Sequence, residues 1–283
     1  MLAFFIRLFS LLPLRILYAI STCACFIIYR IVGYRKQLVW DNLKHAYPEK
    51  SDDEIKLIMG RFYQSFCDHW IETMKLLTMP LAELNSRITA NWEVFDQLNE
   101  ANKDCYALVG HTFNWEWLNV AWPTNMQQQY ACFYTPITNK GFDKLMYMIR
   151  TRTGGWQIPM SAKKGLARLQ GTRFVLGLAA DQNPVDIKHA KWLPFMHREA
   201  PFFQGPEKLA RRSGGAVVFA SIKKQQRGYY KVHFELICAD ASAMEQGEIT
   251  TQYVQFVEQQ LRDQPENWLW SHRRWKHKRL SGE

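Results

Sequence analysis

Short apolar runs alternate with helical patterns along most of the chain. Five of the apolar runs are rich in β-branched and aromatic residues, and they cover residues 105–110, 130–135, 173–181, 215–222 and 229–237. Between and after these runs, the spacing of apolar residues predicts helices near 114–122, 139–150, 162–170, 204–213 and 248–262. Strands that alternate with helices indicate an α/β fold in which a mostly parallel sheet is flanked by helices.

The segment before the first strand is predicted to be helical. A short helix should end before Pro48, because the residue before a proline avoids the helical conformation. Ser51 and Glu54 form the sequence pattern of a capping box, which predicts that a long helix begins there and runs to about Leu77. At the other end of the chain, Pro265 is predicted to open a short last helix.

The N-terminal segment is strongly apolar and contains no acid. Its longest uncharged run has 14 residues and lies between Arg15 and Arg30, which is short of the ~20 residues that span a bilayer. A helix from Pro13 to about Val32 would place one arginine near each end, where the charge can reach the membrane surface. A cleaved signal peptide does not fit, because no small-residue cleavage site follows a single apolar core.

This pattern predicts that the chain has two parts. Residues 1–33 are predicted to be a membrane anchor, embedded from the cytoplasmic face, and residues 34–283 to form one α/β domain. The alternative is that the first segment is an ordinary buried core helix, because an apolar run of this length occurs in both settings.

The excess positive charge lies at the two ends of the chain. The net charge is +10; residues 1–40 and 271–280 each contain five basic residues and no acid, while the rest is neutral. Such ends suit an anionic membrane surface, an acidic protein partner or nucleic acid. The apolar N-terminus favours the membrane.

Near the C-terminus, tryptophan alternates with basic residues in "WLWSHRRWKHKR". Surfaces that bind single-stranded nucleic acid share this pattern, but no nucleic-acid fold signature accompanies it here. Tryptophan at a membrane interface, with arginine and lysine reaching the head groups, explains both ends of the chain together. We therefore predict a membrane and no nucleic acid among the partners; the alternative for Trp268 and Trp270 is the protein core.

The sequence does not contain the patterns of several common kinds of metal and catalytic site. The six cysteines are scattered, mostly inside apolar runs, and form neither a CxxC pair nor a Cys/His zinc spacing, which predicts buried free thiols and no metal site. The GxSxG, GxxxxGK[ST] and HExxH patterns are also missing, which argues against a serine hydrolase, a phosphate-loop enzyme and a zinc protease.

The candidate chemistry lies just after the first predicted strand, in "GHTFNWEWLN". On one helix, His111 and Glu116 would point roughly 140° apart. They can meet if His111 lies in the turn after the strand and Glu116 in the first turn of the next helix. Gly110 permits a tight turn and Asn114 is a good N-cap, so this arrangement is predicted. A carboxylate beside an imidazole fixes its tautomer and allows it to act as a general base.

The whole chain resembles the bacterial late acyltransferases of lipid A biosynthesis, within the wider lysophospholipid acyltransferase group. Six segments are similar to the family's blocks and occur in the family's order: "YRKQLVWDNLKHAYPE", "HTFNWEW", "MIRTRTGG", "GLAADQNP", "GPEKLARRSGGAVVFASI" and "PENWLWSHRRWK". The second is similar to the family's His-x4-Asp/Glu motif. One departure is Thr135 in "FYTPITNK", where many relatives have arginine, which puts the exact acceptor in doubt.

The resemblance implies a glycerolipid-acyltransferase-like α/β fold and an O-acyltransferase at the cytoplasmic face of the bacterial inner membrane. It implies that His111 is the general base on a hydroxyl of a lipid A precursor and that Glu116 orients it. The acyl donor would be the thioester of an acyl carrier protein or coenzyme A, with no acyl-enzyme, cofactor or metal.

The resemblance also implies that Arg150, with Arg152 beside it, binds a donor or acceptor phosphate or the developing oxyanion. Both arginines could instead lie at a solvated helix end. Asp181 and Gln182 follow an apolar strand and are further candidates for substrate binding, with a turn cap as the alternative. Two other functions stay open: an acyltransferase for another glycolipid or a lysophospholipid, and a catalytically silent membrane-binding homologue.

Overall fold

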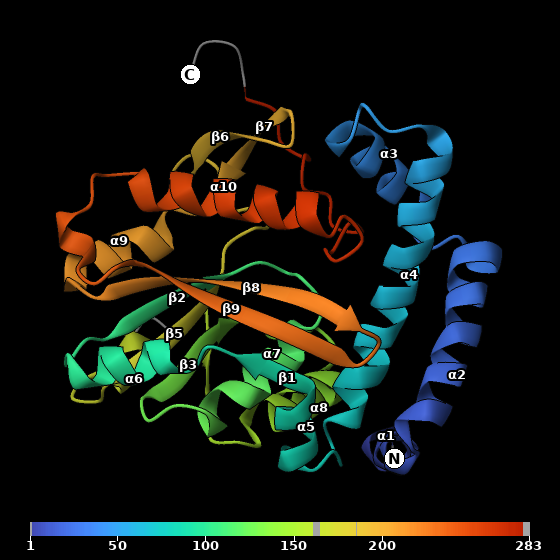
Figure 1. Ribbon diagram of the computed structural model, residues 1–283, viewed down its shortest axis with the longest axis horizontal. Helices are drawn as coiled ribbons and strands as arrows, with labels where there is room; N and C mark the ends of the chain where they lie inside the picture. The colour runs from blue at the N-terminus through green and yellow to red at the C-terminus, as the bar shows by residue number, and fades with distance from the viewer. Residues whose placement is uncertain (1, 161–164, 185, 280–283) are drawn as a thin grey trace.

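The computed structural model describes residues 2–160, 165–184 and 186–279, and it contains a central seven-stranded sheet (Figure 1). Its strands, in the order in which they lie side by side, are β1 (Ile88–Ala90), β9 (Tyr229–Cys238), β8 (Ala216–Gln226), β2 (Cys105–Val109), β5 (Phe174–Ala179), β3 (Gln129–Tyr134) and β4 (Trp156–Pro159). Neighbouring strands are parallel except for β8 and β9. The mostly parallel sheet predicted from the sequence is therefore confirmed.

Helices cover both faces of the sheet. On one face lie α9 (Gly205–Ser213) and α10 (Glu248–Asp263). On the other face lie α5 (Leu81–Arg87), α6 (Glu93–Glu100), α7 (Trp115–Ala121) and α8 (Lys140–Thr151). At one end of the strands stand α1 (Leu2–Leu11), α2 (Leu14–Phe26), α3 (Lys36–Ala46) and the long α4 (Asp52–Lys75). Figure 1 shows α2 lying against the outer side of α4.

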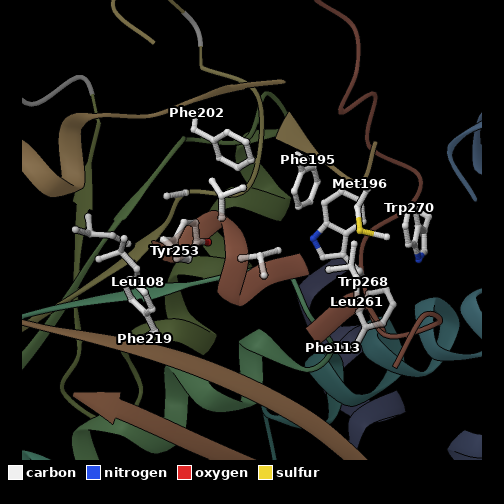
Figure 2. Packing of buried hydrophobic residues seen from close by; sticks show 14 of the residues in the cluster. Leu108, Phe113, Phe195, Met196, Phe202, Phe219, Tyr253, Leu261, Trp268 and Trp270 are labelled. Carbon is white, nitrogen blue, oxygen red and sulfur yellow. The ribbon is translucent and has the colours of Figure 1, made fainter. Parts of the chain in front are cut away.

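Alternate side chains of the strands enter two separate cores. In β2, Leu108 belongs to the core beneath α10, and its neighbour Ala107 belongs to the core beneath α7 and α8. Figure 2 shows the first core, where Leu108 and Phe219 of the sheet approach Tyr253 of α10 and Trp268 lies farther along. This alternation follows from the two-residue period of a strand that is covered on both faces.

The five strands predicted from the sequence are all present. Strands β1 and β4 were not predicted, because three or four residues are too few to show an alternating pattern. The antiparallel hairpin of β6 (Lys191–Phe195) and β7 (Arg198–Phe202) was also missed; each of its strands contains a proline, which weakens a strand signal.

Helix ends follow the local capping signals. Ser51 and Glu54 form both hydrogen bonds of the predicted capping box at the start of α4. The helix predicted near 162–170 falls partly on residues 161–164, outside the described residues, and Gly165–Leu169 form a 3-10 helix. The short helix predicted after Pro265 is wrong, because residues 264–279 form turns instead.

The N-terminal segment forms a helix with two different sides. After α2, a π-helical stretch (Ile27–Val32) continues it, so the helix from Leu14 to Val32 is long and apolar enough to cross a membrane by length and composition. One side packs against α4 and buries Leu17 and Ser21 completely. Only 22% of its most apolar stretch is buried, so most of its apolar surface faces outward, unlike that of a core helix.

The C-terminal aromatic stretch belongs to the core. Trp268 and Trp270 are buried, and so is the guanidinium of Arg274, which lies over the rings of Phe195 and Phe202. Figure 2 shows Trp268 and Trp270 within the cluster next to Phe195. The prediction that these two tryptophans lie at a membrane interface is therefore wrong, and the alternative, the protein core, is confirmed.

Candidate functional site

Two neighbouring parallel strands bring the central pair of the site together. Val109, the last residue of β2, is paired with Ala179, the last residue of β5. His111 and Asp181 each come two residues later, so they leave the same edge of the sheet side by side. The carboxyl ends of parallel strands are where open α/β sheets place their ligands.

Asp181 holds both the ring and the backbone of His111. Its Oδ1 lies 2.6 Å from the Nδ1 of His111, and its Oδ2 accepts the backbone N–H of His111 at 2.7 Å. The indole N–H of Trp268 also donates to Oδ2, at 2.6 Å. Since Nδ1 is engaged, Nε2 is the ring nitrogen that remains to act on a substrate.

Burial and pairing act in opposite directions on Asp181. The side chain is fully buried, which alone would raise its pKa, but the imidazole of His111 and the hydrogen bonds from His111 and Trp268 lower the pKa to about 2. Asp181 is therefore ionised at neutral pH. A buried carboxylate in this position fixes the imidazole tautomer and stabilises an imidazolium as it forms.

Glu116, in the first turn of α7, forms a second buried pair, an ion pair with Arg150 of α8. Asn114 caps α7, and its Oδ1 accepts the backbone N–H of Glu116 at 3.1 Å and that of Trp117 at 3.2 Å. Glu116 accepts two hydrogen bonds from the guanidinium of Arg150 on α8, one of them from Nε at 2.9 Å. The indole of Trp115 donates a third, at 3.1 Å.

Arg150 decides the charge of Glu116. The carboxyl group is buried, which by itself would raise its pKa, but the guanidinium of Arg150 and the hydrogen bonds from Arg150 and Trp115 lower the pKa below its usual value. Glu116 is thus held as a carboxylate. In return, the forked contact fixes the orientation of Arg150.

His111, Glu116 and Arg150 line one cavity of about 450 Å³, while Asp181 is fully buried and contacts His111. Its wall is mostly apolar and aromatic and includes Trp122, Phe133, Tyr134 and Met160. The polar groups that reach it are Asn119, Cys132, Thr135, Gln157, Gln182 and Asn183, together with His111, Glu116 and Arg150. An apolar cavity with a few convergent polar groups is typical of a ligand site.

The carboxylate that faces His111 differs from the expected one. The sequence pattern predicted that Glu116 orients His111, but Asp181 occupies that position and Glu116 binds Arg150. The physical reason is the order of the strands: β5 lies directly beside β2, so its end delivers a carboxylate to His111. Glu116 points from α7 toward α8, where Arg150 meets it.

The two arginines of the "MIRTRTGG" segment have different surroundings. Arg150 lines the cavity. The guanidinium of Arg152 instead donates to the backbone carbonyls of Leu76 and, at 2.8 Å, of Met79, just after the end of α4. Gln182 and Thr135 line the cavity. Asp181, the other residue expected to bind substrate, is fully buried and contacts His111 instead.

Three supporting residues escaped the sequence analysis. Trp268 holds Asp181, and Glu72 and His69 of α4 contact the cap residue Asn114. Glu72 and His69 lie in the middle of the long helix α4, far in sequence from the motif at His111, so no local pattern connects them with the site. Among the described residues, no group of three or more His, Cys, Asp or Glu could hold a metal ion.

The buried ring of His69 predicts a pH-dependent stability. The ring packs on Trp115, with ring centroids 3.9 Å apart. Burial lowers the pKa of His69 to about 4. The charge of Glu116 opposes this change, while the charges of Arg150 and His111 add to it. Between pH 4 and the ordinary histidine pKa near 6.5, the unfolded chain therefore binds a proton that the folded chain does not. Stability should fall as the pH is lowered through this window, by about 1.4 kcal/mol per pH unit for each such histidine.

Urea unfolding at pH 7.5, 6 and 5 checks this expectation. His69→Gln supplies a matched variant, because an amide can still bond to Asn114 but does not titrate. His272, whose pKa is also lowered to about 4 by burial, should continue to contribute in this variant. An unfolding midpoint of His69→Gln that falls with pH as steeply as that of the parent would contradict the assignment.

A family model described as bacterial lipid A biosynthesis acyltransferase matches residues 1–277. No curated protein sequence is similar enough to the chain to count as a relative. The matched range includes the apolar N-terminal helix as well as the cavity residues.

Proposed function

Because the chain belongs to the bacterial lipid A biosynthesis acyltransferase family, which is membrane-associated, we propose that it moves a fatty acyl chain from an acyl thioester to a hydroxyl of a lipid A precursor. The family assignment makes the protein an acyltransferase. The observation that carries the proposed chemistry is the His111–Asp181 pair at the edge of an apolar cavity.

In the proposed reaction, Nε2 of His111 accepts the proton of the acceptor hydroxyl. The hydroxyl oxygen attacks the thioester carbonyl, a C–O bond forms, and the C–S bond breaks. The sulfur leaves as a thiolate, which takes the proton from His111. Asp181 acts through His111, because it holds the ring by Nδ1 and stabilises the transient imidazolium.

Glu116 has a different proposed role from the one implied by the sequence pattern. It holds Arg150 in a fixed orientation at the cavity wall. A fixed guanidinium in an apolar cavity can bind a phosphate group of either substrate, or the oxyanion that develops on the thioester carbonyl. Gln182 lines the same cavity as Arg150 and can hydrogen-bond the same substrates. Arg152, in contrast, has a structural role, because it binds backbone carbonyls just after α4.

We propose acyl carrier protein as the donor, with coenzyme A thioester as the alternative. A concave basic surface near the C-terminus, lined by Lys44, Arg198, Arg273 and Lys276, supports an acidic donor. Initial rates with matched acyl chains on the two carriers distinguish them. A higher kcat/KM for the coenzyme A thioester would select the alternative.

Lipid A extracted from cells with and without the gene tests the proposed function. Mass spectrometry should show one acyl chain fewer in the strain that lacks the gene, and the wild-type gene should restore it. An unchanged lipid A, combined with a changed phospholipid or other glycolipid, would favour the second acceptor class. Thr135, the residue at which the chain departs from the resemblance, lines the cavity and supports this alternative. No lipid change at all would indicate the silent homologue.

The outward side of the N-terminal helix predicts how the protein binds membranes. Ile16, Ile27 and Ile31 are each about half exposed or more, and we propose that they embed in the cytoplasmic face of the inner membrane. Replacing all three by serine should lower the fraction bound to anionic vesicles about tenfold or more, since burying one isoleucine stabilises by about 1.5 kcal/mol or more. The remaining binding should weaken with salt, because basic residues then dominate it.

Flotation with vesicles at low and high salt measures this effect. Leu236→Ser on β9 is a control, since it removes an exposed leucine far along the chain from the helix. Deleting residues 1–33 is a poorer test, because the same helix buries Leu17 and Ser21 against α4. Triple-variant binding that equals that of the parent would show that another surface attaches the protein.

A further inference from the structure

We propose that the N-terminal helix is a positioning element of the active site, because Tyr18 on α2 is hydrogen-bonded to Glu72, which holds the cap of the helix that carries Glu116. This inference rests on the function proposed above. It assigns to α2 a second role besides membrane attachment, and it makes Tyr18 and Glu72 positioning residues for acyl transfer.

The first contacts join α2 to α4. The hydroxyl of Tyr18 donates to Oε1 of Glu72 at 2.8 Å. On the other side of the same carboxylate, Oε2 accepts from the hydroxyl of Tyr230 at 2.6 Å and from the amide of Asn114 at 2.8 Å. Glu72 is fully buried, so its oxygens depend on these protein donors.

The next contacts join α4 to α7. Asn114, held by Glu72, directs its other amide atom, Oδ1, to the backbone N–H groups of Glu116 and Trp117. The backbone carbonyl of Glu72 also accepts the indole N–H of Trp117, at 2.9 Å. Glu72 therefore fixes the first turn of α7 twice, once through its side chain and once through its backbone.

The buried position of Glu72 makes each donor matter. Burial raises the pKa of its carboxyl group, which the hydrogen bonds from Tyr230 and Asn114 oppose. A carboxylate that loses a donor has to turn toward water, take up a proton or pull on its remaining partners. Each response changes the bond to Asn114, and with it the position of Glu116 and of the Arg150 guanidinium that Glu116 holds.

A neighbouring hydrogen bond also joins α2 to α4, but its buried carboxylate does not bind the cap of α7. Ser21, nearly one turn after Tyr18, donates its hydroxyl to the buried carboxylate of Asp68 at 2.7 Å. The other partners of Asp68 are Gln64 and two basic residues of the β8–β9 hairpin, Lys224 and Arg227. Arg227 also donates to the backbone carbonyl of Tyr18 and lies over its ring, and Tyr18→Phe keeps both contacts. Since the described partners of Asp68 do not lie on α7, Ser21→Ala is a matched control.

The experiment compares Tyr18→Phe with Ser21→Ala in the full-length protein in detergent micelles, where membrane binding does not limit the rate. Each change deletes one hydroxyl of α2 that binds a buried carboxylate of α4. We expect similar decreases in thermal midpoint, but a fall in kcat of about threefold to tenfold for Tyr18→Phe alone, which corresponds to losing one buried hydrogen bond. KM for the acyl donor should stay unchanged, because Tyr18 is not among the residues that line the cavity.

A third variant, Tyr230→Phe, removes a donor from Glu72 without altering α2, and should lower kcat in the same way. Equal kcat values for Tyr18→Phe and Ser21→Ala would overturn the inference, and so would a kcat loss in Tyr18→Phe that only matches the fraction of unfolded protein. Failure of the proposed function is a separate outcome: it would appear as no acyl transfer to a lipid A precursor by the parent protein itself.

Discussion

His111→Gln should remove acyl transfer while leaving the fold intact. The amide can still donate to Asp181, so the buried carboxylate keeps a partner. It cannot accept a proton near neutral pH, so turnover should fall by about 10²–10⁴. His111→Ala should lose as much activity but also some stability, because it leaves one oxygen of Asp181 without its donor. Purified variants are compared by initial rates with an acyl carrier protein donor and by thermal unfolding.

Asp181→Asn and the double variant with His111→Gln determine whether the two residues act as one unit. Asparagine keeps the shape of the side chain but gives up the charge that stabilises the imidazolium, so a large loss of kcat is expected on its own. The double variant should be scarcely worse than His111→Gln, since residues that act together give non-additive losses. Losses that multiply would show that Asp181 has a role of its own, and near-normal turnover in His111→Gln would refute the base assignment.

The fold was largely predictable because its strands are long, buried and locally distinct. The runs that became β2, β5 and β8 are apolar on both faces, which is the pattern of central parallel strands. Local capping chemistry was also visible, as Ser51 and Asn114 show. The hairpin of β6 and β7 could not be predicted in this way, since its short strands owe their shape to the core onto which they fold.

The sequence identified the acidic and basic residues of the site, but not which of them contact one another. Both Asp181 and Glu116 were among the candidates, yet the partner of His111 was taken to be the acid nearest in sequence. The order of the strands decides the pairing, and the sequence pattern does not reveal that β5 lies beside β2. Contacts between residues far apart in the sequence, such as Trp268 with Asp181 or Tyr18 with Glu72, could not be predicted either. They depend on how distant elements pack, which a local sequence pattern does not reveal.

The Glu116–Arg150 pair should matter for stability and activity in separable ways. Arg150→Met removes the only arginine that pairs with Glu116 in the described part of the chain and leaves a buried, unpaired carboxylate. Breaking a buried ion pair from one side costs about 3–5 kcal/mol, so the urea midpoint should fall markedly. Turnover should fall as well, because the fixed positive charge at the cavity wall is gone.

Adding Glu116→Gln to Arg150→Met distinguishes the two losses. With the charge neutralised, the penalty for an unpaired carboxylate disappears, so most of the lost stability should return. Turnover should stay low, since the guanidinium is still missing. Arg152→Met is the control from the same segment: it loses its bonds to the carbonyls of Leu76 and Met79, so it should lose stability but keep kcat per folded molecule. If the double variant regained its turnover together with its stability, Arg150 would serve only to neutralise Glu116, and the substrate phosphate or oxyanion would have to be bound by another group in the cavity.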